Sequence, residues 1–156
     1  MTIHTILHPT DFSDRSRVAF DVACSLARDQ RARLVLLHVN DSATAESADE
    51  ALVRKLEQML DERLRALRPD DVSVAVGHRL IRGNPPQVIL DVAQELSADL
   101  IVMGTHGYTG LTRALMGSVA EEVVRGADSP VLTVKTPSTR RPETSRVVPT
   151  AVVPVM

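Results

Sequence analysis

Short apolar runs alternate along the chain with longer amphipathic segments. The runs occupy residues 3–8, 34–39, 72–80, 100–103 and 130–134, and their length and composition are typical of strands. In the third run, the alternation places Val72, Val74 and Val76 on one face. Between the runs, apolar residues recur every three or four positions, as on the buried face of a helix. This alternation predicts an α/β fold with a parallel sheet and right-handed crossovers.

Cap and turn residues suggest where the four predicted helices begin and end. Ser13 is a suitable N-cap, and Asn84 followed by Pro85 predicts another helix start. A long helix follows the polar stretch 40–49 and ends before Pro69; its apolar stripe consists of Leu52, Leu56, Met59, Leu60, Leu64 and Leu67. The last helix begins at 117–118 and ends near Gly126.

The most informative stretch is 100–119, LIVMGTHGYTGLTRALMGSV. It runs from an apolar strand through a loop with several glycines to a helix start at Gly117 and Ser118. Glycine lets a backbone approach a ligand closely, and the first N–H groups of a helix can bind an anion. The stretch therefore predicts a phosphate-binding site. The alternative is a long loop whose glycines merely make it flexible.

The spacing of these glycines is more specific than their number. Gly104, Gly107 and the pair 117–118 fit G-x2-G-x9-G-[S/T], which resembles the nucleotide-binding signature of the universal stress protein family. The spacing fits neither a Walker A loop nor the Rossmann fingerprint. The start ILHPTDFSD and the segment GSVAEEVVRGADSPVLTV are similar to the family's first strand and to its last helix and strand.

The likeness extends from residue 2 to about residue 135. It implies a single doubly wound domain whose five-stranded parallel sheet has the order 3-2-1-4-5, with helices on both faces. The chain then divides into a nucleotide-binding domain over 1–135 and a linker with an apolar tail over 136–156. In such a sheet, ligands bind beyond the carboxyl ends of the strands where the order reverses.

This reversal brings the turn after the first strand beside the glycine-rich loop. The expected nucleotide-binding residues are Pro9, Thr10, Asp11, Val39, Met103, Gly104, His106, Gly107, Arg113, Gly117, Ser118 and Val119. By resemblance, Gly104, His106 and Gly107 contact the ribose and the inner phosphates. The same resemblance assigns the outer phosphates to residues 117–119.

Several of these residues also have a structural interpretation. Asp11 can accept hydrogen bonds from ribose or adenine or hold a metal through water, but it also suits a turn or a helix N-cap. Val39 can form an apolar wall for adenine or pack in the core, and Met103 has the same two interpretations. Arg113 can reach a γ-phosphate or remain solvated.

Three histidines suggest a metal site as a rival interpretation. His8, His38 and His106 all lie at the carboxyl ends of predicted strands, and histidine is a common zinc ligand. They lack short ligand spacing and a cysteine partner, so hydrogen bonds within the sheet are the alternative for His8 and His38. We expect no metal site.

Composition and charge exclude several classes of protein. The net charge of −2, with scattered basic residues, does not indicate a nucleic-acid or anionic-membrane surface. The chain has no apolar run of bilayer length, and its start lacks the features of a signal peptide. The lone Cys24 suits a reducing compartment and is expected to be a buried, unreactive thiol. A cytoplasmic protein is expected.

The resemblance implies an ATP-binding protein, with Mg²⁺, that acts as a nucleotide-dependent stress-response sensor or interaction module with a downstream protein partner. The alternative is a slow ATP hydrolase or phosphotransferase. The loop has no lysine and no obvious base beyond His106, which favours binding without efficient turnover. A third possibility keeps the fold without binding nucleotide, but the filled glycine positions argue against it.

The end of the chain suggests two further contacts. Val131–Val134 would be an edge strand, and pairing with its two-fold mate in a homodimer would satisfy its free backbone groups, as the resemblance also implies. The polar linker 136–146 leads to VVPTAVVPVM, whose prolines exclude a central strand or a helix interior. We interpret this tail as a docking segment for its own subunit or its dimer partner; a frayed terminus is the alternative.

Overall fold

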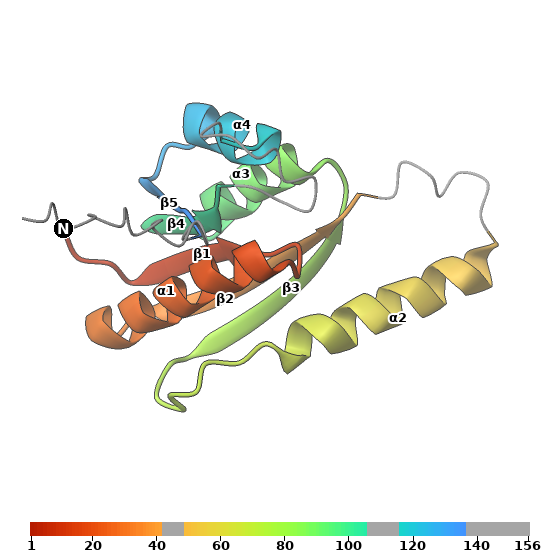
Figure 1. The fold of residues 1–156 in the computed structure, drawn as a ribbon, viewed down its shortest axis with the longest axis horizontal. Helices are drawn as coiled ribbons and strands as arrows, with labels where there is room; N and C mark the ends of the chain where they lie inside the picture. The colour runs from red at the N-terminus through yellow and green to blue at the C-terminus, as the bar shows by residue number, and fades with distance from the viewer. Residues whose placement is uncertain (42–48, 106–115, 137–156) are drawn as a thin grey trace, which may run out of the picture.

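A computed structural model describes residues 1–41, 49–105 and 116–136. Within these ranges, five parallel strands form one sheet in the order β3-β2-β1-β4-β5, which confirms the predicted order (Figure 1). The strands are β1 (Thr5–Pro9), β2 (Arg33–Asn40), β3 (Val76–Arg82), β4 (Leu100–Gly104) and β5 (Val131–Val134). The helices are α1 (Asp14–Gln30), α2 (Glu50–Ala66), α3 (Pro85–Glu95) and α4 (Ser118–Gly126).

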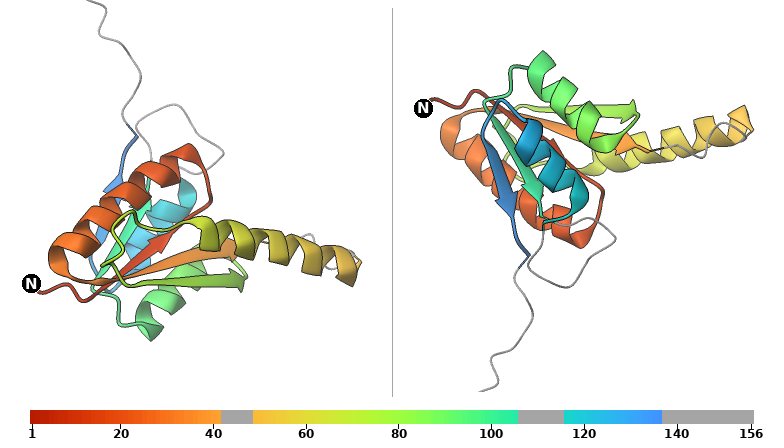
Figure 2. Two further views of the ribbon diagram at one scale, coloured as in Figure 1. Left: turned by 90° about the horizontal axis from the view of Figure 1, so that it is seen from below. Right: turned by 90° about the horizontal axis from the view of Figure 1, so that it is seen from above.

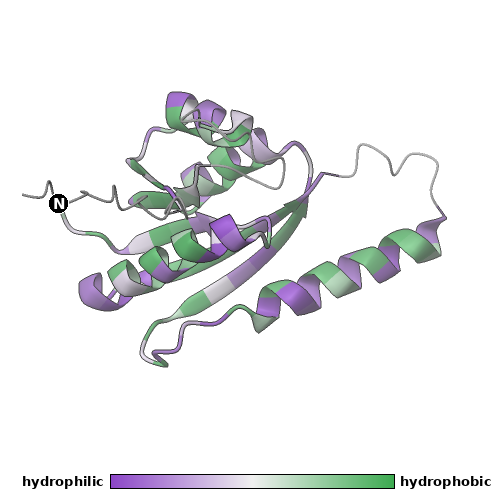
Figure 3. Ribbon diagram, viewed as in Figure 1, coloured by the Kyte–Doolittle hydropathy of each residue, from purple (hydrophilic) through white to green (hydrophobic). Residues whose placement is uncertain are grey.

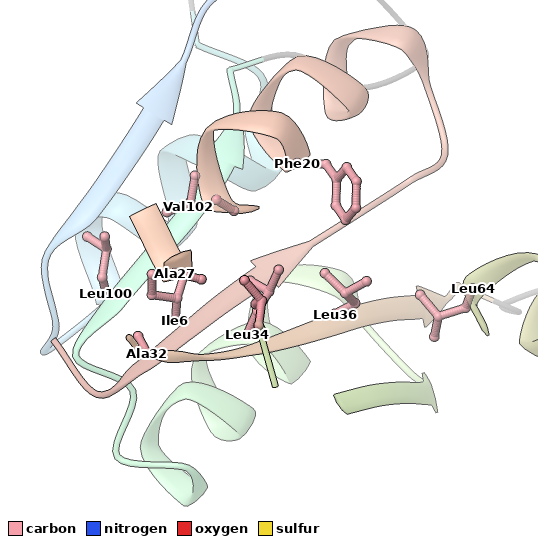
Figure 4. Close-up of a cluster of buried hydrophobic side chains, with 11 residues drawn as sticks. Ile6, Phe20, Ala27, Ala32, Leu34, Leu36, Leu64, Leu100 and Val102 are labelled. Carbon is pink, nitrogen blue, oxygen red and sulfur yellow. The ribbon is translucent and has the colours of Figure 1, made fainter. Parts of the chain in front are cut away.

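Both faces of the sheet are covered, because successive side chains along each strand enter opposite layers. On one face, Ile6 and Leu34 pack with Phe20 of α1 and Leu64 of α2 (Figure 4). On the other face, the neighbouring strand residues pack against α3 and α4. The predicted doubly wound architecture with helices on both faces is therefore confirmed (Figure 2).

Three of the four described helices begin with a side-chain cap. The Ser13 side chain accepts a hydrogen bond from the Ser16 N–H, and Asp49 and Asn84 cap α2 and α3 in the same manner. The predicted starts at Ser13 and at Asn84-Pro85 are confirmed. Helix α4 also begins and ends where predicted, but its N-cap is Gly117, which supplies no side-chain acceptor.

The predicted start of the third strand is wrong. Strand β3 begins at Val76, and Val72 is 99 % exposed in a turn, whereas Val74 is buried. The turn forms because Oδ1 of Asp71 accepts hydrogen bonds from the backbone N–H of Ser73 at 2.9 Å and from its hydroxyl at 2.6 Å. This side-chain turn competes with the extended conformation that the alternating valines suggested.

The predicted apolar stripe of α2 is only partly covered. Within α2, all of which is described, Leu64 is the buried residue. Leu52, Leu56 and Met59 are exposed, and the N-terminal half of the helix extends beyond the sheet (Figures 1 and 2). None of the helices in the described ranges is long and apolar enough to cross a membrane.

Cys24 lies in α1 and is half-buried rather than fully buried. Burial raises the pKa of its thiol to about 11, and the carboxylate of Asp21 acts in the same direction. The reactive thiolate is therefore disfavoured at neutral pH. The predicted linker and tail lie outside the described residues except for Thr136, so the division of the chain at residue 135 remains a prediction.

Leu64 holds α2 to the sheet, and we expect its truncation to be costly. Leu64→Ala removes a fully buried side chain and leaves a cavity, so it should lower the free energy of unfolding by about 2–5 kcal/mol in a urea titration. Val72→Ala is the matched control, and because Val72 is exposed we expect a change below about 0.5 kcal/mol. Equal unfolding midpoints for the two variants would contradict this packing.

Candidate functional site

A cavity of about 200 Å³ lies at the carboxyl ends of the central strands. Strands β1 and β4 pair through Ile6 with Leu100 and through Leu7 with Ile101, and the connections that follow them line the cavity. The strand order reverses between these two strands, as expected for a ligand site in a doubly wound sheet. We call this cavity the crevice.

The structure brings most of the predicted site residues together at the crevice. Nine of them line it: Pro9, Thr10, Asp11, Val39, Met103, Gly104, Gly117, Ser118 and Val119. The other three, His106, Gly107 and Arg113, lie outside the described residues. Two segments separated by about a hundred residues, the turn after β1 and the start of α4, thus share one surface.

The crevice also has lining residues that sequence reasoning did not assign to it: Ser16, Leu37, His38, Pro85, Ile89, Thr105 and Ala120. Ser16 and Ala120 lie in the first turns of α1 and α4, and Ala120 directly follows the predicted Val119. Pro85 and Ile89 belong to the first turns of α3. The predicted strand order could have indicated these residues, because it brings the connections that follow β1, β3 and β4 to one edge of the sheet.

Asp11 has the turn-forming role that was one of its two interpretations. Its Oδ1 accepts hydrogen bonds from the Ser13 N–H at 3.0 Å and from the Ser13 hydroxyl at 2.6 Å. Ser13 in turn caps α1. Neither bond involves Oδ2 of Asp11, so the structural role leaves one carboxylate oxygen for a ligand at the crevice.

Thr10 is anchored through both its backbone and its side chain. Its N–H donates to the Leu37 carbonyl at 2.8 Å, and its own carbonyl accepts from Nδ1 of His38 at 2.7 Å. Its Oγ1 accepts from the Phe12 N–H at 3.1 Å and from the Ser16 hydroxyl at 2.8 Å. These bonds tie the turn after β1 to β2 and α1, so this wall of the crevice is pre-organised.

An aromatic and cationic stack connects the crevice to α2. The rings of His38 and Phe12 lie 4.4 Å apart between centroids, and the guanidinium carbon of Arg63 lies 4.6 Å from the Phe12 centroid. Phe12 adopts a left-handed φ of 64°, which favours residues without a bulky side chain. Burial lowers the pKa of His38, so the neutral imidazole donates from Nδ1 to Thr10.

His8 of β1 connects its strand to the neighbouring strand β4 through a side-chain hydrogen bond. It is fully buried, and its Nδ1 donates to the Val102 carbonyl at 2.8 Å. Burial lowers its pKa to about 4, although that hydrogen bond and the charge of Asp11 act in the opposite direction. The imidazole is therefore neutral at physiological pH.

The hydrogen bonds of His8 and His38 are relevant to the hypothesis of a metal site. His8 and His38 each hydrogen-bond a backbone carbonyl, which was the alternative to a shared metal. Across the described ranges, no three His, Cys, Asp or Glu side chains are grouped so that they could hold a metal ion. His106, the third histidine of that hypothesis, lies outside them.

The N-terminus of α4 differs chemically from the rest of the crevice. The N–H of Gly117 donates to the Thr105 carbonyl, so the two ends of the glycine-rich loop meet beside β4. Ser118 and Val119 follow in the first helical turn and line the crevice. Because no side chain caps this turn, its N–H groups and the positive end of the helix dipole can interact with an anion.

Val39 and Met103 give the crevice an apolar wall. Val39 is half-buried and packs against the core layer that contains α3, while Met103 is 5 % exposed and belongs to that layer. Both residues also line the crevice. The two interpretations made from the sequence are therefore compatible, since one side of a core residue can face a cavity.

Comparisons with known proteins agree with this architecture. The model of the universal stress protein family matches residues 2–135. The chain belongs to the universal stress protein family. Its curated relatives in the family include universal stress protein MJ0531 of Methanocaldococcus jannaschii, which is 37 % identical over 139 residues, covering 85 % of this chain and 82 % of the relative.

Solved structures show the same relationship. The structure of MJ0577, also from M. jannaschii, superposes with a TM-score of 0.81 at 30 % identity, over 89 % of this chain and 100 % of that one. A universal stress protein in complex with cAMP superposes with a TM-score of 0.62 at 26 % identity, over 88 % of this chain and 100 % of that one.

The buried His8 predicts a specific loss of stability in acid. Its pKa of about 4 lies below the ordinary 6.5, so between these values the unfolded chain binds a proton that the folded chain does not. The free energy of unfolding should therefore fall as the pH falls from 6.5 to 4, by about 3 kcal/mol from this group.

Urea titrations across this pH range measure the effect. His8→Gln removes the titrating imidazole but keeps an N–H donor, so its stability should depend less steeply on pH than that of the wild type. His4→Gln, at an exposed position, is the matched control and should retain the wild-type slope. Parallel profiles for wild type and His8→Gln would show that His8 does not cause the acid sensitivity.

Proposed function

We propose that this chain binds an adenine nucleotide, ATP, in the crevice and acts as a nucleotide-dependent sensor or interaction module of the stress response. The observation that carries the proposal is the N-terminus of α4. Among the described helices, it is the one whose N-cap provides no side-chain acceptor, and it begins at a cavity where the strand order reverses. Phosphate oxygens are the acceptors that such a terminus binds well.

The proposal assigns the nucleotide's parts by chemistry. The outer phosphates bind the N–H groups and the hydroxyl at residues 117–119. Adenine packs on the apolar wall of Val39 and Met103, and the free oxygen of Asp11 accepts a hydrogen bond from the ribose. The cAMP complex of the 26 % identical relative supports the choice of an adenine nucleotide.

Mg²⁺ is proposed to accompany ATP. Asp11 is the one carboxylate among the described lining residues, and Mg²⁺ commonly combines one or two carboxylates with phosphate oxygens and water. The described lining contains no lysine or arginine, so positive charge for phosphoryl transfer is scarce there. For this reason we propose binding without efficient turnover, in the cytoplasm, with the bound state read by a protein partner.

Thermal melting tests the proposal directly. Mg-ATP at a hundred times its dissociation constant should stabilise the ligand-stripped protein by about 2.7 kcal/mol, which is roughly 5–10 °C in Tm for a chain of this size. GTP should have a smaller effect if the apolar wall and Asp11 recognise adenine. An unchanged melting curve in excess Mg-ATP would refute the proposal.

Gly117→Val tests the position of the phosphates. The added side chain would occupy the space before the first turn of α4, so the variant should lose the Mg-ATP stabilisation while melting near the wild type without ligand. Glu122→Val is the matched control, because it adds the same side chain at an exposed position of the same helix. Normal ATP binding by Gly117→Val would mean that the phosphates bind elsewhere.

We also propose a homodimer through the β5 edge. The carbonyls of residues 130 and 134 accept hydrogen bonds from the N–H groups of Ile101 and Thr105, so these residues face β4. Because backbone groups alternate in direction along a strand, those of Val131 and Thr133 face outward. Leu132 of β5 adds exposed apolar surface to this strand. Pairing with a second β5 would satisfy the outward groups of both copies.

Thr133→Pro should weaken this dimer. It removes an outward N–H on an edge strand, where proline is tolerated, and the symmetric pairing loses the bond twice. Sedimentation velocity should show a dissociation constant for this contact raised by about tenfold or more. Thr133→Val keeps the N–H and is the control; equal association of the two variants would argue against pairing through β5.

A further inference from the structure

Helix α2 presents an apolar stripe to solvent. Leu52 is 62 % exposed, Leu56 45 % and Met59 58 %, and we call these three side chains the α2 stripe. Green and purple bands alternate along this helix in Figure 3, so apolar and charged residues share its surface. A cluster of large exposed apolar side chains on a projecting helix marks a surface that another molecule can cover.

The stripe is distinct from the side of α2 that contacts the sheet. On the sheet side, Leu64 is buried, and Glu57 forms an ion pair with Arg82 of β3. The stripe lies beside that side of the helix and ends before Arg63, whose guanidinium lies over Phe12 of the same chain. The N-terminal half of α2, where the stripe begins, extends beyond the sheet (Figure 2).

The spacing of the stripe is that of a coiled-coil seam. Leu52, Leu56 and Met59 follow one another at intervals of four and three residues, which fit successive d, a and d positions. Lys55 and Glu62 then occupy the flanking g positions, and both are exposed. They carry opposite charges seven residues apart.

These two charges are self-complementary, and they favour the antiparallel direction over the parallel one. In an antiparallel pair, g positions face g positions, so Lys55 meets Glu62 of a second copy, and two-fold symmetry forms the contact twice. Leu56 then packs against Met59 of that copy. In a parallel pair, g faces e, and Lys55 would meet the apolar Leu60 instead.

We propose that the α2 stripe pairs in an antiparallel arrangement with the α2 stripe of a second copy of this chain. This contact is separate from the β5 edge, because α2 contacts β2 and β3 while β5 closes the opposite side of the sheet (Figure 1). A chain with both contacts presents two self-complementary surfaces and can assemble beyond a dimer.

Sedimentation equilibrium of the full chain in a Thr133→Pro background isolates the α2 contact. We expect concentration-dependent self-association in this background. Leu56→Glu should weaken it by about tenfold or more, since the substitution places a charge in both halves of the seam. Val72→Glu introduces the same side chain at an exposed valine away from the stripe and should leave the association unchanged. A concentration-independent monomer in the Thr133→Pro background, or equal association with and without Leu56→Glu, would overturn the proposal.

Exchange of the flanking charges provides a second test that keeps the stripe intact. Lys55→Glu and Glu62→Lys should each weaken association by about threefold or more, because each places like charges opposite one another. The double variant restores opposite charges between copies and should recover most of the wild-type affinity. Arg54→Glu, on the opposite side of the helix, is the control. If the double variant associates as weakly as the single ones, the antiparallel register is wrong.

Discussion

Burial of both faces of the parallel sheet is the constraint on which the rest of this structure depends. Residues Leu34, Val35, Leu36 and Leu37 are all buried, although alternate members enter opposite layers. A strand of this kind is stable only between two layers of helices, so every connection must cross over a face and return to the same end. The connections that follow the strands therefore gather at one edge, and the reversal of strand order opens the crevice there.

The backbone groups of the two walls of the crevice, the turn at Thr10 and the start of α4, differ in their hydrogen bonding. Around Thr10, the backbone and the hydroxyl are hydrogen-bonded to neighbouring residues of the protein, which holds the turn rigid. At Gly117, the first turn of α4 has no side-chain cap, although the other three described helices have one. A side-chain cap stabilises a helix by about 1 kcal/mol. Its absence here is understandable if the proposed ligand supplies the acceptors.

Helix α2 buries one residue within its length, Leu64, and its position matters to the crevice. Leu64 anchors its C-terminal half, and Arg63 stacks on Phe12, which in turn stacks on His38. His38 holds the carbonyl of Thr10, so one side of α2 contacts the wall of the crevice through a chain of packed groups. The α2 stripe is exposed among the described residues, and there we propose the contact with a second copy. Helix α2 therefore contributes both to the packing behind the crevice and to the proposed α2 contact.

The sequence by itself determined most of the secondary structure, because caps and periodicity act between near neighbours. Ser13, Asn84 and the pair 117–118 begin helices as predicted, and the apolar runs form strands in the implied order. The exception at Val72 has a local cause, since a side-chain hydrogen bond from the next residue to Asp71 favours a turn over an equally plausible strand. Nine predicted crevice residues could be named in advance because the family resemblance supplied the strand order.

Only the tertiary structure decided which residues completed the site and which apolar residues remained exposed. Ser16, Pro85 and Ile89 reach the crevice from helices that follow different strands, and nothing in their local sequence indicates a ligand. The hydrogen bond of His8 to the Val102 carbonyl, one of its two predicted interpretations, depends on the pairing of β1 with β4. Leu56 and Leu64 have the same residue type and belong to the same apolar pattern, yet one is exposed and the other buried. The periodicity of a helix defines its apolar face, but whether a neighbour covers that face depends on how far the sheet extends beneath it.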